Sequence, residues 1–145
     1  MLKDKRYTEW EDIENNISRC IEQFRTSRFD TILGLARGGM IPATLMSYKL
    51  NCNNLQQFGV RTRDVESIQY YGNPILTGKV LVVDDINDSG LTFSSVDNYI
   101  RYHFDHNEID DIVYCSLYRR YNTKFKSDIT GEAVKDDRWL VFPWD

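Results

Sequence analysis

A short apolar run, Val80-Leu81-Val82-Val83, lies near the middle of the chain between Lys79 and two adjacent aspartates. An apolar run of this length is typical of a strand that is buried on both faces, as in parallel sheets covered by helices. We therefore expect residues 79–83 to form a central strand. Further strands are expected at Thr31–Leu35, Leu55–Arg61, Ile109–Leu117 and Arg138–Phe142.

Helical segments alternate with these strands. The first begins at a predicted capping box, Thr8-x-x-Glu11, and its apolar residues recur at helical spacing up to Phe24. The second has Pro42 in its first turn and runs to about Leu50, and the third runs over residues 92–104. The alternation implies right-handed βαβ units, and hence an α/β fold with a mainly parallel sheet flanked by helices. Residues 1–145 are expected to form one domain.

Composition excludes several classes of function. Eighteen basic and 22 acidic residues give a net charge of −4, which is not typical of a nucleic-acid-binding surface. No apolar run reaches the length of a membrane span, and the first residues do not resemble a signal peptide. Cys20, Cys52 and Cys115 form no CxxC pair. These features predict a cytoplasmic protein with reduced cysteines.

The polar segment after the central strand carries the clearest chemistry. It begins with the acid pair Asp84 and Asp85, and the turn that leads into the next helix consists of Asp88, Ser89, Gly90, Leu91 and Thr92. Backbone N–H groups and small hydroxyl residues at a helix N-terminus form a cradle for a phosphate. Carboxylates beside it make sense if they contact hydrated Mg²⁺ or sugar hydroxyls. Alternatively, Asp88 or Ser89 only caps the helix and the acid pair is solvated.

A second glycine-containing turn, Arg37-Gly38-Gly39, follows the strand expected at residues 31–35. Two glycines allow a tight turn whose N–H groups face an anion, and the guanidinium of Arg37 suits a phosphate. Both turns follow strands, and ligands of parallel sheets bind at the carboxyl ends of the strands. The alternative is an ordinary connection in which Arg37 points to solvent.

Together, the two turns resemble those of type I phosphoribosyltransferases. In that family, apolar residues are followed by two acids, a spacer and Asp-Ser/Thr-Gly-x-Thr, and residues 82–92 are similar to this pattern. The segment at residues 34–42 resembles the pyrophosphate loop of the 6-oxopurine branch, especially in small bacterial xanthine–guanine phosphoribosyltransferases. The resemblance implies purine salvage, in which phosphoribosyl pyrophosphate and guanine, xanthine or hypoxanthine form a nucleotide.

The resemblance also implies a role for each turn. The Arg37 turn would grip the pyrophosphate, and the peptide bond that enters Arg37 would be cis. Asp84 and Asp85 would hold the ribose hydroxyls, in part through Mg²⁺. The turn at residues 88–92 would wrap the 5-phosphate, with Asp88 as the acid/base group near the base.

The end of the chain is similar to the base-binding hood of the same branch, where Trp-apolar-x-x-Pro-Trp-acid recurs. Trp139 would stack on the purine and a backbone group of Leu140 would meet its edge, although Trp139 can also be read as a packing residue. Trp144 is interpreted as a core or interface residue. Relatives place a Lys where Arg120 stands, with Arg119 as a neighbour that could serve instead. Either arginine offers donors to a 6-oxo group.

The long segment at residues 62–78 is expected to be a loop with a turn at Gly72-Asn73-Pro74. By resemblance it would close over the site, with Arg61 and Arg63 as candidates to reach the pyrophosphate. Relatives form dimers or tetramers, so a homo-oligomer is expected. Three alternatives stay open: another base such as a pyrimidine, a nucleotide-sensing regulator of the same fold, and a phosphoacceptor receiver domain. The last would need a later acceptor Asp and a distal Lys, neither of which is evident.

Overall fold

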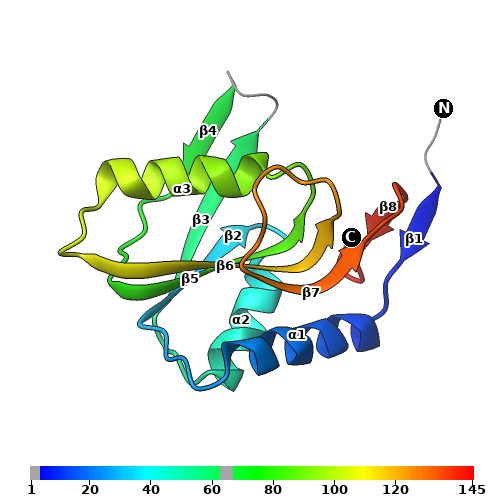
Figure 1. The fold of residues 1–145 in the computed structure, drawn as a ribbon, viewed down its shortest axis with the longest axis horizontal. Helices are drawn as coiled ribbons and strands as arrows, with labels where there is room; N and C mark the ends of the chain where they lie inside the picture. The colour runs from blue at the N-terminus through cyan, green and yellow to red at the C-terminus, as the bar shows by residue number, and fades with distance from the viewer. Residues whose placement is uncertain (1–3, 63–66) are drawn as a thin grey trace.

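The computed structural model describes residues 4–62 and 67–145 (Figure 1). Its larger sheet has six strands in the order β4-β3-β2-β5-β6-β7. They are β2 (Thr31–Ala36), β3 (Leu55–Thr62), β4 (Ile68–Tyr71), β5 (Gly78–Asn87), β6 (Ile109–Arg120) and β7 (Ile129–Val134). Neighbouring strands pair in parallel except β3 and β4, which are antiparallel. The predicted α/β fold with a mainly parallel sheet is confirmed.

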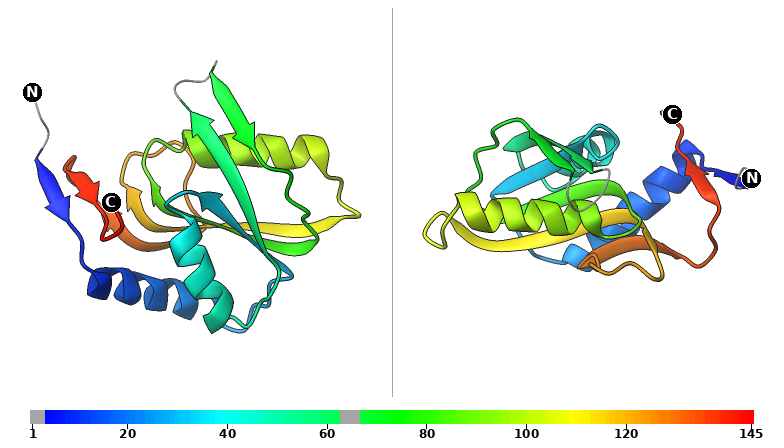
Figure 2. Two further views of the ribbon diagram at one scale, coloured as in Figure 1. Left: turned by 180° about the vertical axis from the view of Figure 1, so that it is seen from behind. Right: turned by 90° about the horizontal axis from the view of Figure 1, so that it is seen from above.

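The alternating side chains of β5 enter two separate cores. The helices are α1 (Trp10–Phe24), α2 (Met40–Lys49) and α3 (Leu91–His103). Leu81 and Val83 pack in a cluster with residues of α1 and α2, whereas Val80 and Val82 pack with residues of α3. Figures 1 and 2 accordingly show α3 on one side of the sheet and the other two helices on the opposite side. Because both faces are covered, β5 is the buried central strand that its apolar run predicts.

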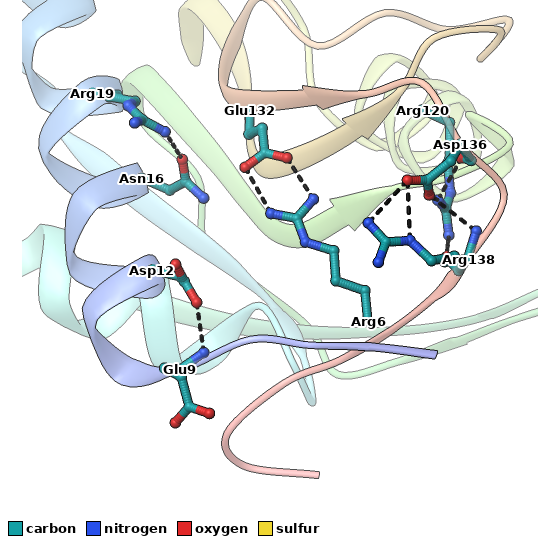
Figure 3. Close-up of polar contacts among 9 residues, drawn as sticks. All are labelled: Arg6, Glu9, Asp12, Asn16, Arg19, Arg120, Glu132, Asp136 and Arg138. Atoms are coloured by element: carbon teal, nitrogen blue, oxygen red, sulfur yellow. Dashed lines mark hydrogen bonds and ion pairs between the residues drawn. The ribbon is translucent and has the colours of Figure 1, made fainter. Parts of the chain in front are cut away.

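A second sheet joins the two ends of the chain. Its strands β1 (Lys5–Tyr7) and β8 (Trp139–Val141) pair in parallel, with Arg6 opposite Leu140. The guanidinium of Arg6 donates to both carboxylate oxygens of Glu132 in β7, at 2.6 Å and 3.0 Å (Figure 3). This bidentate ion pair connects the two-stranded sheet to β7 of the six-stranded sheet.

The predicted capping box at Thr8 and Glu11 is wrong by one residue. Glu9 is the N-cap of α1, and its backbone N–H donates to Oδ2 of Asp12 at 2.8 Å. Thr8 instead donates from its hydroxyl to the carbonyl of Val141 at 2.9 Å, and from its N–H to the same oxygen at 2.8 Å. A contact between the two ends of the chain therefore uses Thr8, and local spacing cannot reveal it.

Strand boundaries also differ from the expected ones. Strands β1, β4 and β7 were not predicted, and β4 lies inside the segment expected to be a loop. β5 continues through the acid pair to Asn87, and β6 continues to Arg120, because the two strands pair from Asp84–Ser116 to Asn87–Arg119. Polar residues are held in strand conformation here by a neighbour that is remote in sequence.

Cys20, Cys52 and Cys115 are buried and have free thiols. Burial raises the pKa of the Cys115 thiol well above its usual value, and the neighbouring Cys20 adds to this effect. In the described ranges, no helix has both the length and the apolar character that crossing a bilayer requires.

Candidate active site

The two glycine-containing turns meet at the carboxyl edge of the large sheet. They follow β2 and β5, which are adjacent and parallel. A methyl group on Gly38 would collide with the carboxylate of Asp85, and one on Gly39 would lie only 2.5 Å from the carbonyl oxygen of Val83. The Arg37 turn therefore lies against the end of β5, where the acid pair stands, and the absence of side chains at Gly38 and Gly39 is what permits this approach.

Arg37 lies on the wall of a cavity beside the turns. The Ala36–Arg37 peptide bond is cis, as the resemblance implies. The cavity measures about 750 Å³, and Arg61 and Tyr71 of the β3–β4 hairpin also line it. Two arginines on one wall suit an anionic group. The other predicted loop arginine, Arg63, lies outside the described residues.

The acid pair Asp84 and Asp85 is partly buried at the end of β5. The N–H of Asp85 donates to Oδ1 of Asp84 at 2.9 Å, and the N–H of Ile86 donates to Oδ1 of Asp85 at 2.7 Å. Burial, followed by the neighbouring carboxylate of Asp85, raises the pKa of Asp84 well above its ordinary value. Burial also raises the pKa of Asp85.

No ion pair to the acid pair is present among the residues that the structure describes. Two adjacent carboxylates without a cationic partner disfavour their own charged forms. A divalent cation would relieve this cost. Hydroxyl groups of a sugar could also donate to the same oxygens.

The turn at residues 88–92 forms the start of α3. The hydroxyl oxygen of Ser89 accepts a hydrogen bond from the N–H of Leu91 at 3.2 Å. Gly90 has a φ of 92°, in the left-handed region that favours glycine. A cavity of about 290 Å³ is lined by Asp88, Ser89, Gly90 and Thr92, together with the acid pair and Thr62 of β3. A helix start with free N–H groups beside such a cavity can hold a phosphate.

A smaller cavity of about 180 Å³ shares Asp85, Ile86 and Asp88 with the one just described. Its other lining residues are Arg120, Trp139, Leu140, Phe142 and Asp145. Trp139 is 58% exposed although it is a large aromatic residue, which leaves a ring face open to a ligand. Of the two arginines that the sequence left open, Arg120 lines this cavity and Arg119 does not.

Trp144 packs against other aromatic residues. Its ring stacks on Phe142 with centroids 4.9 Å apart and lies 5.9 Å from the ring of Trp10. Trp144 is partly buried and packs against the core, which agrees with its interpretation as a core or interface residue.

A family model of the phosphoribosyl transferase domain matches residues 4–103. The chain belongs to this family. The matched range runs from β1 to α3 and includes both turns and the acid pair, so the resemblance drawn from those residues is confirmed.

Several proteins that are similar to this chain are named as purine phosphoribosyltransferases. The chain is 28% identical over 125 residues to a xanthine-guanine phosphoribosyltransferase of Gluconobacter oxydans, covering 81% of this chain and 69% of that protein. The structure of a purine phosphoribosyltransferase from Pyrococcus horikoshii superposes with a TM-score of 0.85 at 27% identity, covering 98% of this chain and 94% of that one. A Helicobacter pylori xanthine-guanine-hypoxanthine phosphoribosyltransferase has a TM-score of 0.82 at 18% identity, over 97% of this chain and 93% of that chain, which shows a shared fold.

The base end of this phosphoribosyltransferase lies beyond the range of the family model. Arg120, Trp139 and Leu140 come after residue 103, so the model match does not bear on them. What supports their grouping is the cavity that all three line with Asp88.

Sequence reasoning missed several residues around the site. Thr62 lines the cavity of the acid pair, and the rule that parallel strands present their carboxyl ends together could have found it. Asn87 donates to the carbonyl of Phe125 at 2.7 Å and to Ser127 at 3.1 Å, which fastens residues 125–127 behind the turn. Asp145 lines the smaller cavity and accepts from the N–H of Phe142 at 2.8 Å. No local motif marks Asn87 or Asp145.

Gly90→Ala should destabilise the phosphoribosyltransferase by about 2–3 kcal/mol. An added Cβ would lie 2.6 Å from the backbone nitrogen of Phe125 and 2.8 Å from Oγ1 of Thr123, and φ would stay positive. Urea unfolding measures the loss. Gly72→Ala is the matched control, because Gly72 also has a positive φ, of 102°, but an added Cβ would lie 3.4 Å from the carbonyl oxygen of Gln57. Equal losses in both variants would show that crowding contributes nothing.

Proposed function

We propose that this protein transfers the 5-phosphoribosyl group of phosphoribosyl pyrophosphate to a 6-oxopurine base and releases pyrophosphate, with residues 1–145 acting as one domain. The observation that carries the proposal is the contact of the Arg37 turn with the acid pair at the end of β5, the strand that leads into the turn at residues 88–92. The cavity lined by Arg37 provides room for pyrophosphate, and the cavity of the acid pair provides room for the ribose phosphate. The cavity lined by Trp139 provides room for the base. Membership of the family and the names of the relatives support the same reaction.

In the proposed reaction, a ring nitrogen of the purine attacks C1 of the ribose and the bond from C1 to the pyrophosphate oxygen breaks. Arg37 and the N–H group of Gly38 would stabilise the negative charge that develops on the leaving group, because the N–H of Gly39 already donates to the carbonyl of Leu35 at 2.8 Å. The N–H groups of residues 88–92 would bind the 5-phosphate and hold C1 in line with the base. Asp88 would accept a proton from the base as the new bond forms.

The donor set at the acid pair fits Mg²⁺. Within the described ranges, no group of three or more His, Cys, Asp or Glu side chains could hold a metal ion by itself. Mg²⁺ usually takes one or two carboxylates and completes its shell with water and substrate oxygens, and Asp84 and Asp85 supply two. When bound, Mg²⁺ would neutralise charge on the pyrophosphate and the ribose oxygens. Asp84 and Asp85 would orient the ribose hydroxyls.

Trp139→Ala should raise KM for the base roughly 10- to 100-fold, because a stacked ring contributes ~1–3 kcal/mol per base. KM for phosphoribosyl pyrophosphate should change little, since Trp139 lines only the smaller of the two adjoining cavities. Tyr102→Ala is the control, because Tyr102 is 85% exposed and lies on α3 outside that cavity. An unchanged KM for the base in Trp139→Ala would assign this ring to packing.

A turnover assay with guanine, xanthine, hypoxanthine, adenine and a pyrimidine tests the proposed function. Phosphoribosyl pyrophosphate and Mg²⁺ are supplied, and nucleotide and pyrophosphate are measured. The 6-oxopurines should react and adenine should not, because the arginine near the base supplies only donors. Loss of product in Arg37→Ala would tie the activity to the turn. Binding of phosphoribosyl pyrophosphate without product for any base would instead support a nucleotide-sensing regulator.

The cellular location and the assembly of the protein are proposed from its cysteines and from the family resemblance. Three buried free thiols suit a reducing cytoplasm. As the family resemblance implies, we propose a homo-oligomer, either a dimer or a tetramer. Sedimentation equilibrium of the purified chain would give the number of subunits.

A further inference from the structure

Arg120, the last residue of β6, makes three hydrogen bonds to groups that lie far apart in sequence. Its Nε donates to Oδ1 of Asp88 at 3.2 Å. Its Nη1 donates to the carbonyl of Asp136 at 3.0 Å, and its Nη2 to the carbonyl of Arg138 at 2.6 Å. Its side chain is only 11% exposed. Figure 3 shows this guanidinium between Asp136 and Arg138.

These contacts connect two segments that line the smaller cavity, the one that contains Asp88 and the one that contains Trp139. The carbonyls of Asp136 and Arg138 belong to the segment that leads directly into Trp139. Asp88 belongs to the turn at the start of α3. The planar guanidinium of Arg120 therefore bridges the segment that precedes Trp139 and the carboxylate of Asp88.

The bond to Asp88 also fixes the direction of that carboxylate. Asp88 is 65% exposed, and a carboxylate with that freedom could rotate away from the base. Arg120 holds Oδ1 and leaves Oδ2 for a proton of the base. A Lys at this position could not reproduce the contacts, since its donors radiate from a single nitrogen, whereas Arg120 donates from three.

We infer that Arg120 is a positioning residue that couples the base-stacking segment at residues 136–139 to Asp88. This inference rests on the proposed function and deepens it. Each terminal nitrogen of the guanidinium has two N–H groups and uses one of them in the contacts described. One N–H on each therefore stays available toward the 6-oxo group of a base, so the positioning role is compatible with base binding.

Two measurements test the coupling with Arg120→Lys, and Arg119→Lys serves as the matched control on the neighbouring position. The first is calorimetric binding of guanosine monophosphate, which needs no turnover. Arg120→Lys should weaken this nucleotide at least tenfold and change the affinity for phosphoribosyl pyrophosphate with Mg²⁺ less than threefold. Arg119→Lys should change neither affinity more than twofold. Unchanged nucleotide affinity in Arg120→Lys, or an equal loss in Arg119→Lys, would overturn the inference.

The second measurement is a double-mutant cycle on kcat with Asp88→Asn. If Arg120 acts through Asp88, Arg120→Lys lowers kcat at least tenfold alone and has little further effect in the Asp88→Asn background. Losses that multiply in the double variant would show that Arg120 does not act through Asp88. Absence of turnover in the unmodified protein would refute the proposed function, while the binding measurement would still decide whether Arg120 holds the base-stacking segment.

Discussion

Asp88→Asn is expected to lower kcat by roughly 10²- to 10⁴-fold, the usual contribution of a general acid/base group. The amide keeps an oxygen that can accept the hydrogen bond from Arg120 but cannot take a proton from the base. KM for phosphoribosyl pyrophosphate should change only a few-fold, because the N–H groups of the turn are unaltered. Steady-state kinetics with saturating base and Mg²⁺ measure both constants.

Asp110→Asn provides the control for charge. Asp110 is exposed near the start of β6 and lines neither cavity that contains Asp88. Its variant should retain the kcat of the unmodified protein. If Asp88→Asn also retained it, Asp88 would have no role in proton transfer.

Asp84→Asn should have opposite effects on activity and stability. We expect kcat/KM for phosphoribosyl pyrophosphate to fall by about 10²-fold or more, because one of two carboxylates for the ribose and Mg²⁺ is lost. Without Mg²⁺, the variant should unfold at a higher temperature than the unmodified protein at pH 7. Its amide oxygen can still accept the N–H of Asp85, and the buried charge beside Asp85 is gone.

The direction in which the stability of the folded protein changes with pH follows from the raised pKa of Asp84. The pKa of Asp84 is raised in the folded protein, first by burial and then by Asp85, so the folded state binds this proton more tightly than the unfolded state. The contribution of Asp84 to stability is therefore fully present below its unfolded pKa, about 3.9, and is lost as the pH rises through the raised folded pKa. Asp84→Asn should lose this part of the slope when thermal unfolding is followed across pH in EDTA.

Asp110→Asn, at an exposed position in β6, should retain the slope and serves as the control. Adding Mg²⁺ should stabilise the unmodified protein and have a smaller effect on Asp84→Asn. A lower stability of Asp84→Asn with an unchanged slope would mean that this carboxylate is not a source of repulsion in the folded protein.

The phosphate side of the site could be predicted because its chemistry is local in sequence. Strand, acid pair, Asp88 and Gly90 follow one another within residues 80–90, and the parallel arrangement brings this segment beside the Arg37 turn. The glycines were recognised from the same local pattern. The close approach of Gly38 and Gly39 to the end of β5, which excludes a side chain at Gly39, became visible only in three dimensions.

The base side could be predicted only in part because pairing between distant segments builds it. Trp139 and Arg120 were named as candidates by resemblance, but nothing near Arg120 in the sequence indicates that it donates to the carbonyls of Asp136 and Arg138. The three-residue strand β1 has no detectable period, and it forms only because β8 lies beside it. Likewise, Thr8 looked like a helix cap because its real partner, Val141, is 133 residues away.

The pairing of β1 with β8 has a consequence for how the protein is made. During synthesis, both glycine-containing turns leave the ribosome well before Trp139 does. Strand β1 therefore has no strand to pair with until β8 has been synthesised. The pocket for the base is thus completed late in synthesis. A nascent chain halted after α3 would carry both glycine-containing turns and lack Trp139, the ring on which we propose that the purine stacks.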